Sequence, residues 1–255
     1  MLGLNNGLIG VRKVPAIGSA SGLWAPNEQV LAKRAGIWPA TDTNFASVSL
    51  LLHMDGGNGS TTFTDSSSNV FTVTANGNAQ ISTAQSKFGG ASGYFDGFSD
   101  YLTVADNAAF ELGANNFTVE NWVYFAGYPS SNAGAYNSTI ACQDVTGSRG
   151  WVFLVSGTAS SLDSLGFAGF PNSDNSGVLL ALQSYSFSLN TSYHVAAVRL
   201  GNLLYLFVNG TLLNSGGDAF NITIFNTTSP LKIGASEFDG TYKYALNGYI
   251  DDFRL

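Results

Sequence analysis

The carboxylates of this sequence do not form the close pair that glycan cleavage needs. An acid and a base must flank one glycosidic bond, and the Glu-x-Asp-x-x-Glu pattern by which some glycan-cleaving enzymes place this pair on one strand is absent. The glutamates instead lie far apart, at Glu28, Glu111, Glu120 and Glu237. In FTVENWVYF, strand alternation places Glu120 on one face with Trp122 and Tyr124. We expect this carboxylate to be held by hydrogen bonds; an acid on a glycan-binding face is the alternative.

Other catalytic groups are few. His53 and His194 are the two histidines, and each lies in a strand-like apolar run that favours a structural role. Cys142 is the single cysteine, so an intrachain disulfide is impossible, and we expect its side chain to be buried. Two histidines and one cysteine barely supply a zinc site, and the Gly-Gly pairs lack the Lys-Ser/Thr of a phosphate-binding loop. We therefore predict that the protein is not an enzyme.

Calcium is the metal that these residue types suit best, because it binds hard oxygen ligands. Aspartates gather near the expected first and last strands and in YFDGFSDY, at Asp55, Asp65, Asp96, Asp100, Asp251 and Asp252. Neighbouring residues of a strand point to opposite faces, so only one of Asp251 and Asp252 can enter a given site. The alternative is that these aspartates cap the backbone of their own turns.

Aromatic side chains are the candidates for sugar binding, because their faces stack on sugar rings. The chain has 4 Trp, 11 Tyr and 18 Phe residues. Those in polar, glycine-rich loops are the predicted glycan contacts: Tyr128, Tyr136, Phe170, Tyr242 and Tyr244. Trp122, Trp151 and Phe153 lie in strand-like runs and are expected in the core.

Composition and charge exclude several classes of protein. Hydrophobic residues make up 45% and charged residues 11% of the 255 residues, which argues against disorder. Residues 1–40 carry a net charge of +3 and residues 41–255 a net charge of −10. An acidic body lacks the clustered Lys and Arg of a nucleic-acid binder. No apolar run reaches the roughly 18 residues that span a bilayer, and the N-terminus does not resemble a signal peptide.

Turn and strand signals divide the chain into a head and a β-rich body. Residues 24–39 predict one short helix, bracketed by Trp24 and Trp38, with Val30 and Leu31 on its apolar face. Lys33 and Arg34 suit its C-terminal end. From about residue 47 onward, β-branched and aromatic runs predict an all-β fold, a sandwich or jelly roll. The expected strands are 47–53, 71–75, 101–104, 117–125, 151–155, 193–200, 203–208 and 248–255, with a three-stranded meander at 193–213.

Five stretches resemble the laminin-G-like, concanavalin-A-like jelly-roll family: residues 50–69, 86–104, 117–125, 192–213 and 230–255. The resemblance implies two stacked antiparallel sheets of six or seven strands each. It also implies that the last strand returns to pair near the first. Members often hold a structural calcium where the terminal strands meet, which implies Asp251 or Asp252 together with Asp55 or Asp96 as ligands.

Residues 21–39, SGLWAPNEQVLAKRAGIWP, resemble a segment that precedes such jelly rolls in structural proteins of tailed bacteriophages. The resemblance implies a virion protein, a tail fibre or a decoration protein. Residues 1–40 would dock on other virion proteins through Trp24, Val30, Leu31, Arg34 and Trp38. Residues 41–255 would form the displayed jelly roll, which adheres to a host-surface glycan. Copies are expected to form homo-oligomers, with a trimer by analogy. A purely architectural role and a glycan-cleaving enzyme are the alternatives.

Overall fold

The computed structural model describes residues 44–129, 131–132, 135–174, 176–238 and 241–255. The expected helix and the docking residues Trp24, Val30, Leu31, Arg34 and Trp38 lie outside these ranges. Residues 48–255 form one compact unit that is almost entirely β-structure. Two short 3-10 helices, η1 (Phe45–Ser47) and η2 (Ala108–Phe110), are the helices of the described chain, and neither is long enough to cross a membrane.

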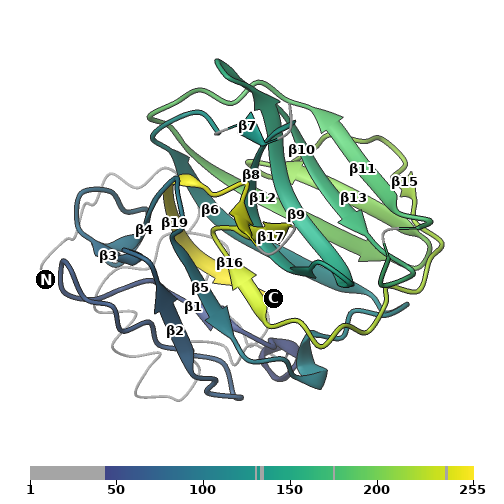
Figure 1. Ribbon diagram of the computed structural model, residues 1–255, viewed down its shortest axis with the longest axis horizontal. Coiled ribbons are helices and arrows are strands. Elements are labelled where there is room, and N and C mark those ends of the chain that lie inside the picture. Colours follow the sequence, from purple (N-terminus) through teal and green to yellow (C-terminus); the bar gives the residue numbers. More distant parts are fainter. Residues whose placement is uncertain (1–43, 130, 133–134, 175, 239–240) are drawn as a thin grey trace, which may run out of the picture. The chain divides into compact units, whose positions relative to one another are not determined.

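Two antiparallel sheets stack face to face, as the jelly-roll prediction requires (Figure 1). The nine-stranded sheet has the order β14 (Thr211–Leu212), β13 (Leu203–Val208), β12 (Ser192–Leu200), β6 (Phe117–Phe125), β19 (Asn247–Arg254), β4 (Ser92–Asp96) and β3 (Gln80–Ser82). Two further strands pair outside this path: β1 (Leu51–Leu52) with β19, and β15 (Asp218–Ala219) with β13.

The eight-stranded sheet forms the other layer. Its order is β11 (Leu179–Ser184), β10 (Ser161–Gly169), β9 (Ser148–Thr158), β8 (Ala135–Val145), β16 (Leu231–Ile233), β5 (Tyr101–Val104) and β2 (Val73–Asn76), and β7 (Ser131–Asn132) pairs with β8. A separate hairpin joins β17 (Ser236–Phe238) and β18 (Thr241–Lys243). Seven strands form the continuous path of each sheet, and the strands beyond the expected six or seven are two residues long.

Most segments expected to form strands do so, and two long strands were not expected. The meander at 193–213 is confirmed: Gly201 and the Asn209-Gly210 pair take the positive φ angles of its tight turns. Strands β8 and β10 are absent from the predicted segments, because Gly, Ser, Asn and Ala interrupt their β-branched and aromatic residues. Their long neighbours in the sheet, rather than local propensity, hold them extended.

The core lies between the two sheets and is rich in aromatic side chains. Trp151 and Phe153 are fully buried, as expected. Phe167 on β10 is central to this cluster: its ring lies 5.7 Å from that of Trp151 and 5.8 Å from that of Phe220. Such pairs contribute beyond the area that they bury, so this cluster adds to the stability of the core.

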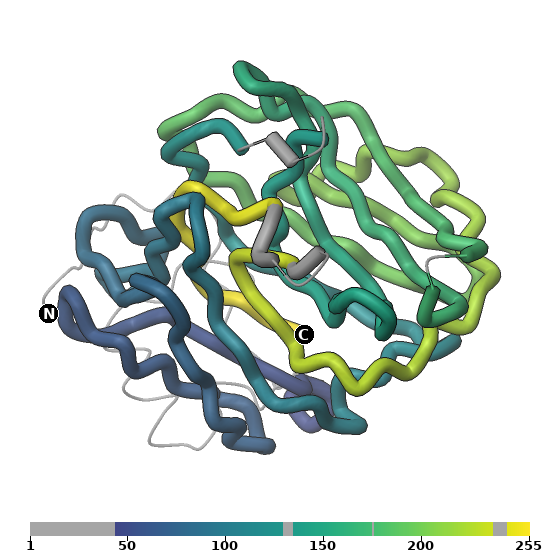
Figure 2. Tube along the Cα trace, viewed as in Figure 1, coloured from purple at the N-terminus to yellow at the C-terminus, as the bar shows by residue number. Residues whose placement is uncertain are grey.

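The last strand closes the sandwich against the first, as the family resemblance implies. Leu51 pairs with Arg254 and Leu52 with Phe253. The backbone of Leu255 also exchanges hydrogen bonds with that of Leu50, at 3.0 and 3.1 Å. Figure 2 shows the purple start of the described chain running beside its yellow end. Consequently, strand β19 is an inner strand of the sheet rather than an exposed end.

We expect Phe167→Ala to lower the free energy of unfolding by about 3–5 kcal/mol, because it leaves a cavity among packed rings. Phe98→Ala is the matched control, since the Phe98 side chain is 76% exposed. Its effect should stay within about 0.5 kcal/mol. Chemical denaturation measures both variants, and equal losses would contradict the central position of Phe167.

Candidate functional site

Alternation along β6 turns three side chains away from the core. Val119, Val123 and Phe125 are buried between the sheets. Glu120, Trp122 and Tyr124 are half-buried and lie on the outward face of the nine-stranded sheet. The expectation that Trp122 belongs to the core is therefore wrong. Its position alternates with the core residues of its own strand, and that alternation decides which face it occupies.

Neighbouring strands extend this outward face into a row of aromatic rings. Tyr249 of β19 lies directly opposite both Tyr124 of β6 and Tyr94 of β4. Its ring centroid is 5.6 Å from that of Tyr124 and 5.0 Å from that of Tyr94. On the same face, the Trp122 ring lies 5.4 Å from His194 of β12. We call Trp122, Tyr124, Tyr249 and Tyr94 the aromatic row.

The segment between β3 and β4, here called loop 85–90, folds over one side of the row. Ser92 Oγ donates to the carbonyl of Gln85 at 2.7 Å. The backbone N–H groups of Lys87 and Phe88 donate to Asp251 Oδ2 at 2.6 and 3.0 Å. Gly89 has φ 58°, and a Cβ there would overlap the Asp55 carboxylate, so this turn requires glycine. The loop thereby brings the Lys87 ammonium to 4.0 Å from the Trp122 ring centroid.

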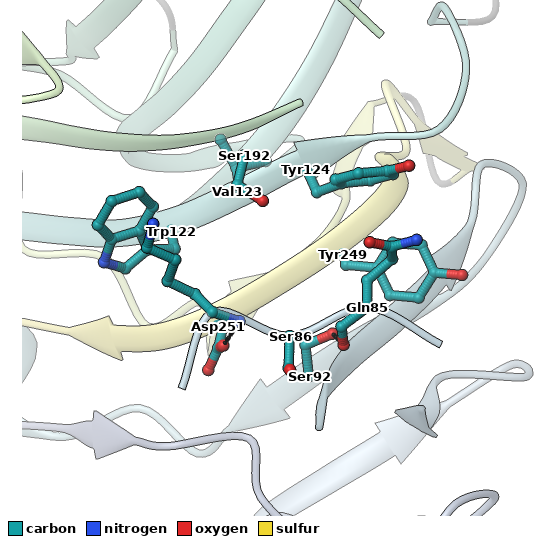
Figure 3. A pocket seen from close by; sticks show the side chains of 10 residues that line it. Gln85, Ser86, Ser92, Trp122, Val123, Tyr124, Ser192, Tyr249 and Asp251 are labelled. Atoms are coloured by element: carbon teal, nitrogen blue, oxygen red, sulfur yellow. Dashed lines mark hydrogen bonds between the residues drawn. The ribbon is translucent and has the colours of Figure 1, made fainter. Parts of the chain in front are cut away.

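A shallow pocket lies between loop 85–90 and the aromatic row (Figure 3). Figure 3 shows Trp122 on one side, the Tyr124 and Tyr249 rings on the other, and polar side chains between them. Its lining consists of Gln85, Ser86, Lys87, Ser92, Trp122, Val123, Tyr124, Ser192, Tyr249 and Asp251. Aromatic faces beside hydroxyl and amide groups are the combination that binds a sugar ring and its hydroxyls.

Glu120 lies at the end of this face and is held by two basic side chains. It forms an ion pair with Arg254 of β19, and its Oε2 lies 3.4 Å from His194 Nε2. The hydrogen bond from His194 lowers the pKa of Glu120 and the charge of Arg254 lowers it further, whereas burial opposes both. The expectation of a carboxylate satisfied by hydrogen bonds is therefore confirmed. A general acid would need the opposite shift.

Asp251 is buried beneath loop 85–90. Burial raises the pKa of Asp251, the two backbone N–H groups of the loop oppose this, and the charges of Asp252 and Asp55 add to the rise. Its Oδ1 is buried without a hydrogen-bond partner in the described structure. The carboxylate therefore anchors the loop that forms the wall of the pocket.

The four predicted calcium ligands have separate roles in the described chain. Asp251 anchors loop 85–90, whereas Asp252 Oδ1 lies 2.9 Å from His53 Nδ1. Asp96 accepts the N–H of Phe98 at 2.9 Å, as a turn aspartate does. Asp55 lies against Gly89. Within the described ranges, no three His, Cys, Asp or Glu side chains gather as metal ligands, and the calcium site stays a prediction.

The predicted loop contacts do not form the aromatic row. Phe170 is wrong as a glycan contact: it is 4% exposed and lies under the Arg149 guanidinium, 4.4 Å from the ring centroid. Packing of Arg149 against Asp144 covers it from solvent. Tyr128 is exposed, and Tyr136 and Tyr244 are half-buried. The side chain of Tyr242 lies outside the described part.

Sequence reasoning missed Tyr94, Tyr249 and Lys87 as parts of the site. The two tyrosines could have been found from strand alternation. Each precedes a core residue, Phe95 on β4 and Ile250 on β19, and therefore points to the outward face. No pattern within one segment of the sequence predicts that Lys87 lies over the Trp122 ring. Cys142 behaves as expected for a structural residue: it is fully buried, and burial raises the pKa of its thiol.

We expect Glu120→Gln to lower the free energy of unfolding at neutral pH, because Arg254 and His194 lose their carboxylate partner. A carboxylate with a lowered folded-state pKa stabilises fully above its unfolded-state pKa, near 4.5, and less as the pH falls through its folded-state pKa. The difference between the variant and the wild type should therefore shrink below that value. Denaturation curves at several pH values measure it, and a difference independent of pH contradicts the ion pair.

None of the curated proteins matches the sequence, whereas solved structures share its fold. The binding domain of botulinum neurotoxin serotype G has 14% identity and a TM-score of 0.57 over 81% of this chain and 47% of that one. The chain thus spans about half the length of that domain. A type C botulinum neurotoxin structure, whose cell entry depends on two ganglioside molecules, has 16% identity and a TM-score of 0.52, over 82% of this chain and 47% of that one.

Domain 4 of AbnA, a GH43 extracellular arabinanase from Geobacillus stearothermophilus in complex with arabinotriose, has 17% identity and a TM-score of 0.51. The similarity covers 81% of this chain and 90% of that one, so the two domains are comparable in size. At these identities, the likeness shows the fold. The family model of the concanavalin A-like lectin/glucanases superfamily matches residues 92–255, more than half of the sequence, and the chain belongs to this superfamily.

Proposed function

We propose that the protein is a non-enzymatic glycan-binding protein that holds a sugar against its aromatic row. The observation that carries the proposal is the pocket in which Trp122 and Tyr249 flank the polar side chains of Gln85, Ser86 and Ser192. One sugar ring contacts these aromatic side chains, with the Lys87 ammonium that lies over Trp122 as a further donor, and its hydroxyl groups exchange hydrogen bonds with the polar lining. The ion pair of Glu120 with Arg254 supports binding over cleavage, because it holds this carboxylate ionised.

The solved structures support the same proposal. Domain 4 of AbnA has this fold and is in complex with arabinotriose, and type C botulinum neurotoxin depends on gangliosides for cell entry. Neither of them identifies the sugar that this chain binds. An array of neutral and acidic glycans, probed with the full chain with and without calcium, is therefore the first experiment.

We expect Trp122→Ala and Tyr249→Ala each to weaken binding of an array hit at least about tenfold, because each removes a stacking surface. Tyr205→Ala is the matched control. Tyr205 is half-buried on the same outward face, on β13, but it is not part of the pocket lining. Isothermal titration measures all three variants, after circular dichroism has shown that each is folded.

Each outcome of the glycan experiment decides between the alternatives. If no glycan binds the wild type under either condition, the proposal fails and an architectural role is favoured. If Tyr128→Ala abolishes binding while Trp122→Ala and Tyr249→Ala do not, the sugar binds at the loops instead of the aromatic row. Release of reducing ends that Glu120→Gln abolishes would show an enzyme.

We further propose that the protein is a structural component of a tailed-phage virion, with residues 1–40 docking on the particle. The resemblance of residues 21–39 to phage structural proteins supports this, together with the +3 charge of residues 1–40 beside the acidic remainder. Deletion of residues 1–40 should prevent incorporation into particles, measured by mass spectrometry of purified virions. Truncated protein that still incorporates would contradict docking through this segment.

A further inference from the structure

The edge strand β11 of the eight-stranded sheet lacks the usual features that prevent pairing with another chain. Natural edge strands commonly carry a charge, a proline or a bulge. Residues 175–193 contain no charged residue and no proline. The six residues of β11 pair with β10 in one unbroken register, from Leu179 to Ser184. The outer edge of β11 is therefore regular, uncharged and open to a further strand.

Two leucines on β11 are exposed to solvent on the outward face of this sheet. Leu180 is 54% and Leu182 is 42% exposed, whereas Ala181 between them is buried toward the core. Leu182 lies over Gly166 of β10, where a Cβ would come within 2.8 Å of Leu182 Cδ1 and 3.4 Å of Leu154 Cδ1. The leucines thus continue an apolar surface from Leu154 to the open edge of the sheet, where nothing in the described chain covers them.

The other ends of the sheet paths differ from β11. Strands β3 and β14 have three and two residues, and β2 has four. β2 ends in Thr-Ala-Asn and offers no exposed leucine. Among these four terminal strands, β11 therefore combines the greatest length with an uncharged sequence and exposed leucines.

We infer that β11 pairs antiparallel with β11 of a second copy of this chain, so that the two eight-stranded sheets become one continuous sheet. Two-fold antiparallel pairing makes the interface self-complementary and closes as a dimer, in place of the trimer expected by analogy. It brings Leu180 and Leu182 of both copies to the same outward face, where they cover one another across the seam. The residues of β11 bring no charge to the seam, and the carboxylate bound to this strand, Asp218 with Gln183, comes from β15 of the other sheet. A pairing shifted by one residue would set the outward leucines of one copy opposite core-facing residues of the other, such as Ala181, so the register is restricted.

A second copy fits this edge because it brings the same uncharged strand and the same exposed leucines to the seam. Its backbone donors and acceptors pair with those of the first copy when its direction is reversed. Residues 1–43, outside the described part, are the competing occupant. The experiment separates the two because self-pairing depends on protein concentration, whereas coverage by the same chain does not.

Sedimentation velocity of the full chain over a wide concentration range tests the inference. We expect the wild type to form a dimer, and Leu180→Lys to raise the dimer dissociation constant at least about tenfold, because two ammonium groups then approach across the seam. Leu200→Lys is the matched control. Leu200 is 61% exposed on β12 of the other sheet, so this variant should dimerise as the wild type does.

Hydrogen exchange distinguishes edge pairing from packing of the leucines alone. Amides of β11 should gain protection as concentration rises, whereas those of the edge strand β2 should not. A wild type that stays monomeric at every concentration overturns the inference, as does a dimer that Leu180→Lys leaves intact. If the protein stays monomeric and the β11 amides are protected equally at all concentrations, residues of the same chain cover this edge. This result also overturns the inference.

Discussion

The backbone pairing of β19 with β1, β4 and β6 is the constraint on which the candidate site depends. This pairing places Tyr249 opposite Tyr94 and Tyr124, and Asp251 opposite Trp122. The core-facing residues of β19 fix its register, because Ile250 and Phe253 are fully buried between the two sheets. Since a slip by one residue would exchange the two faces of the strand, the packing of the core determines the arrangement of the outward face.

An irregularity in β19 allows two of its charged residues, Asp251 and Arg254, to lie on the same outward face. Asp252 has φ 50°, and the register with β6 shifts between Asp251 and Arg254. A regular strand would turn residues 251 and 254 to opposite faces. The extra residue instead leaves Phe253 in the core while both Asp251 and Arg254 lie outward. Asp251 can then anchor loop 85–90, and Arg254 can pair with Glu120.

Local sequence predicts what depends on alternation within one strand, and it fails where distant strands meet. FTVENWVYF was enough to place Glu120, Trp122 and Tyr124 on one face, and the turns at Gly201 and Asn209-Gly210 were enough to predict the meander. The partners of Trp122 come from β12, β19 and loop 85–90, far along the chain, and no local pattern encodes that pairing. Phe170 looked like a loop aromatic because its cover, Arg149, comes from another strand.

The proposed dimer and the proposed glycan site are compatible because they use different sheets. The open edge of β11 belongs to the eight-stranded sheet, whereas the aromatic row lies on the outward face of the nine-stranded sheet. Pairing through β11 therefore leaves the aromatic row uncovered, and each dimer carries two sites. The pocket is shallow, so the proposed binding at a single site contacts little more than one sugar ring. On a surface with repeated glycans, the second site binds at a high effective concentration, and two weak contacts give stable attachment.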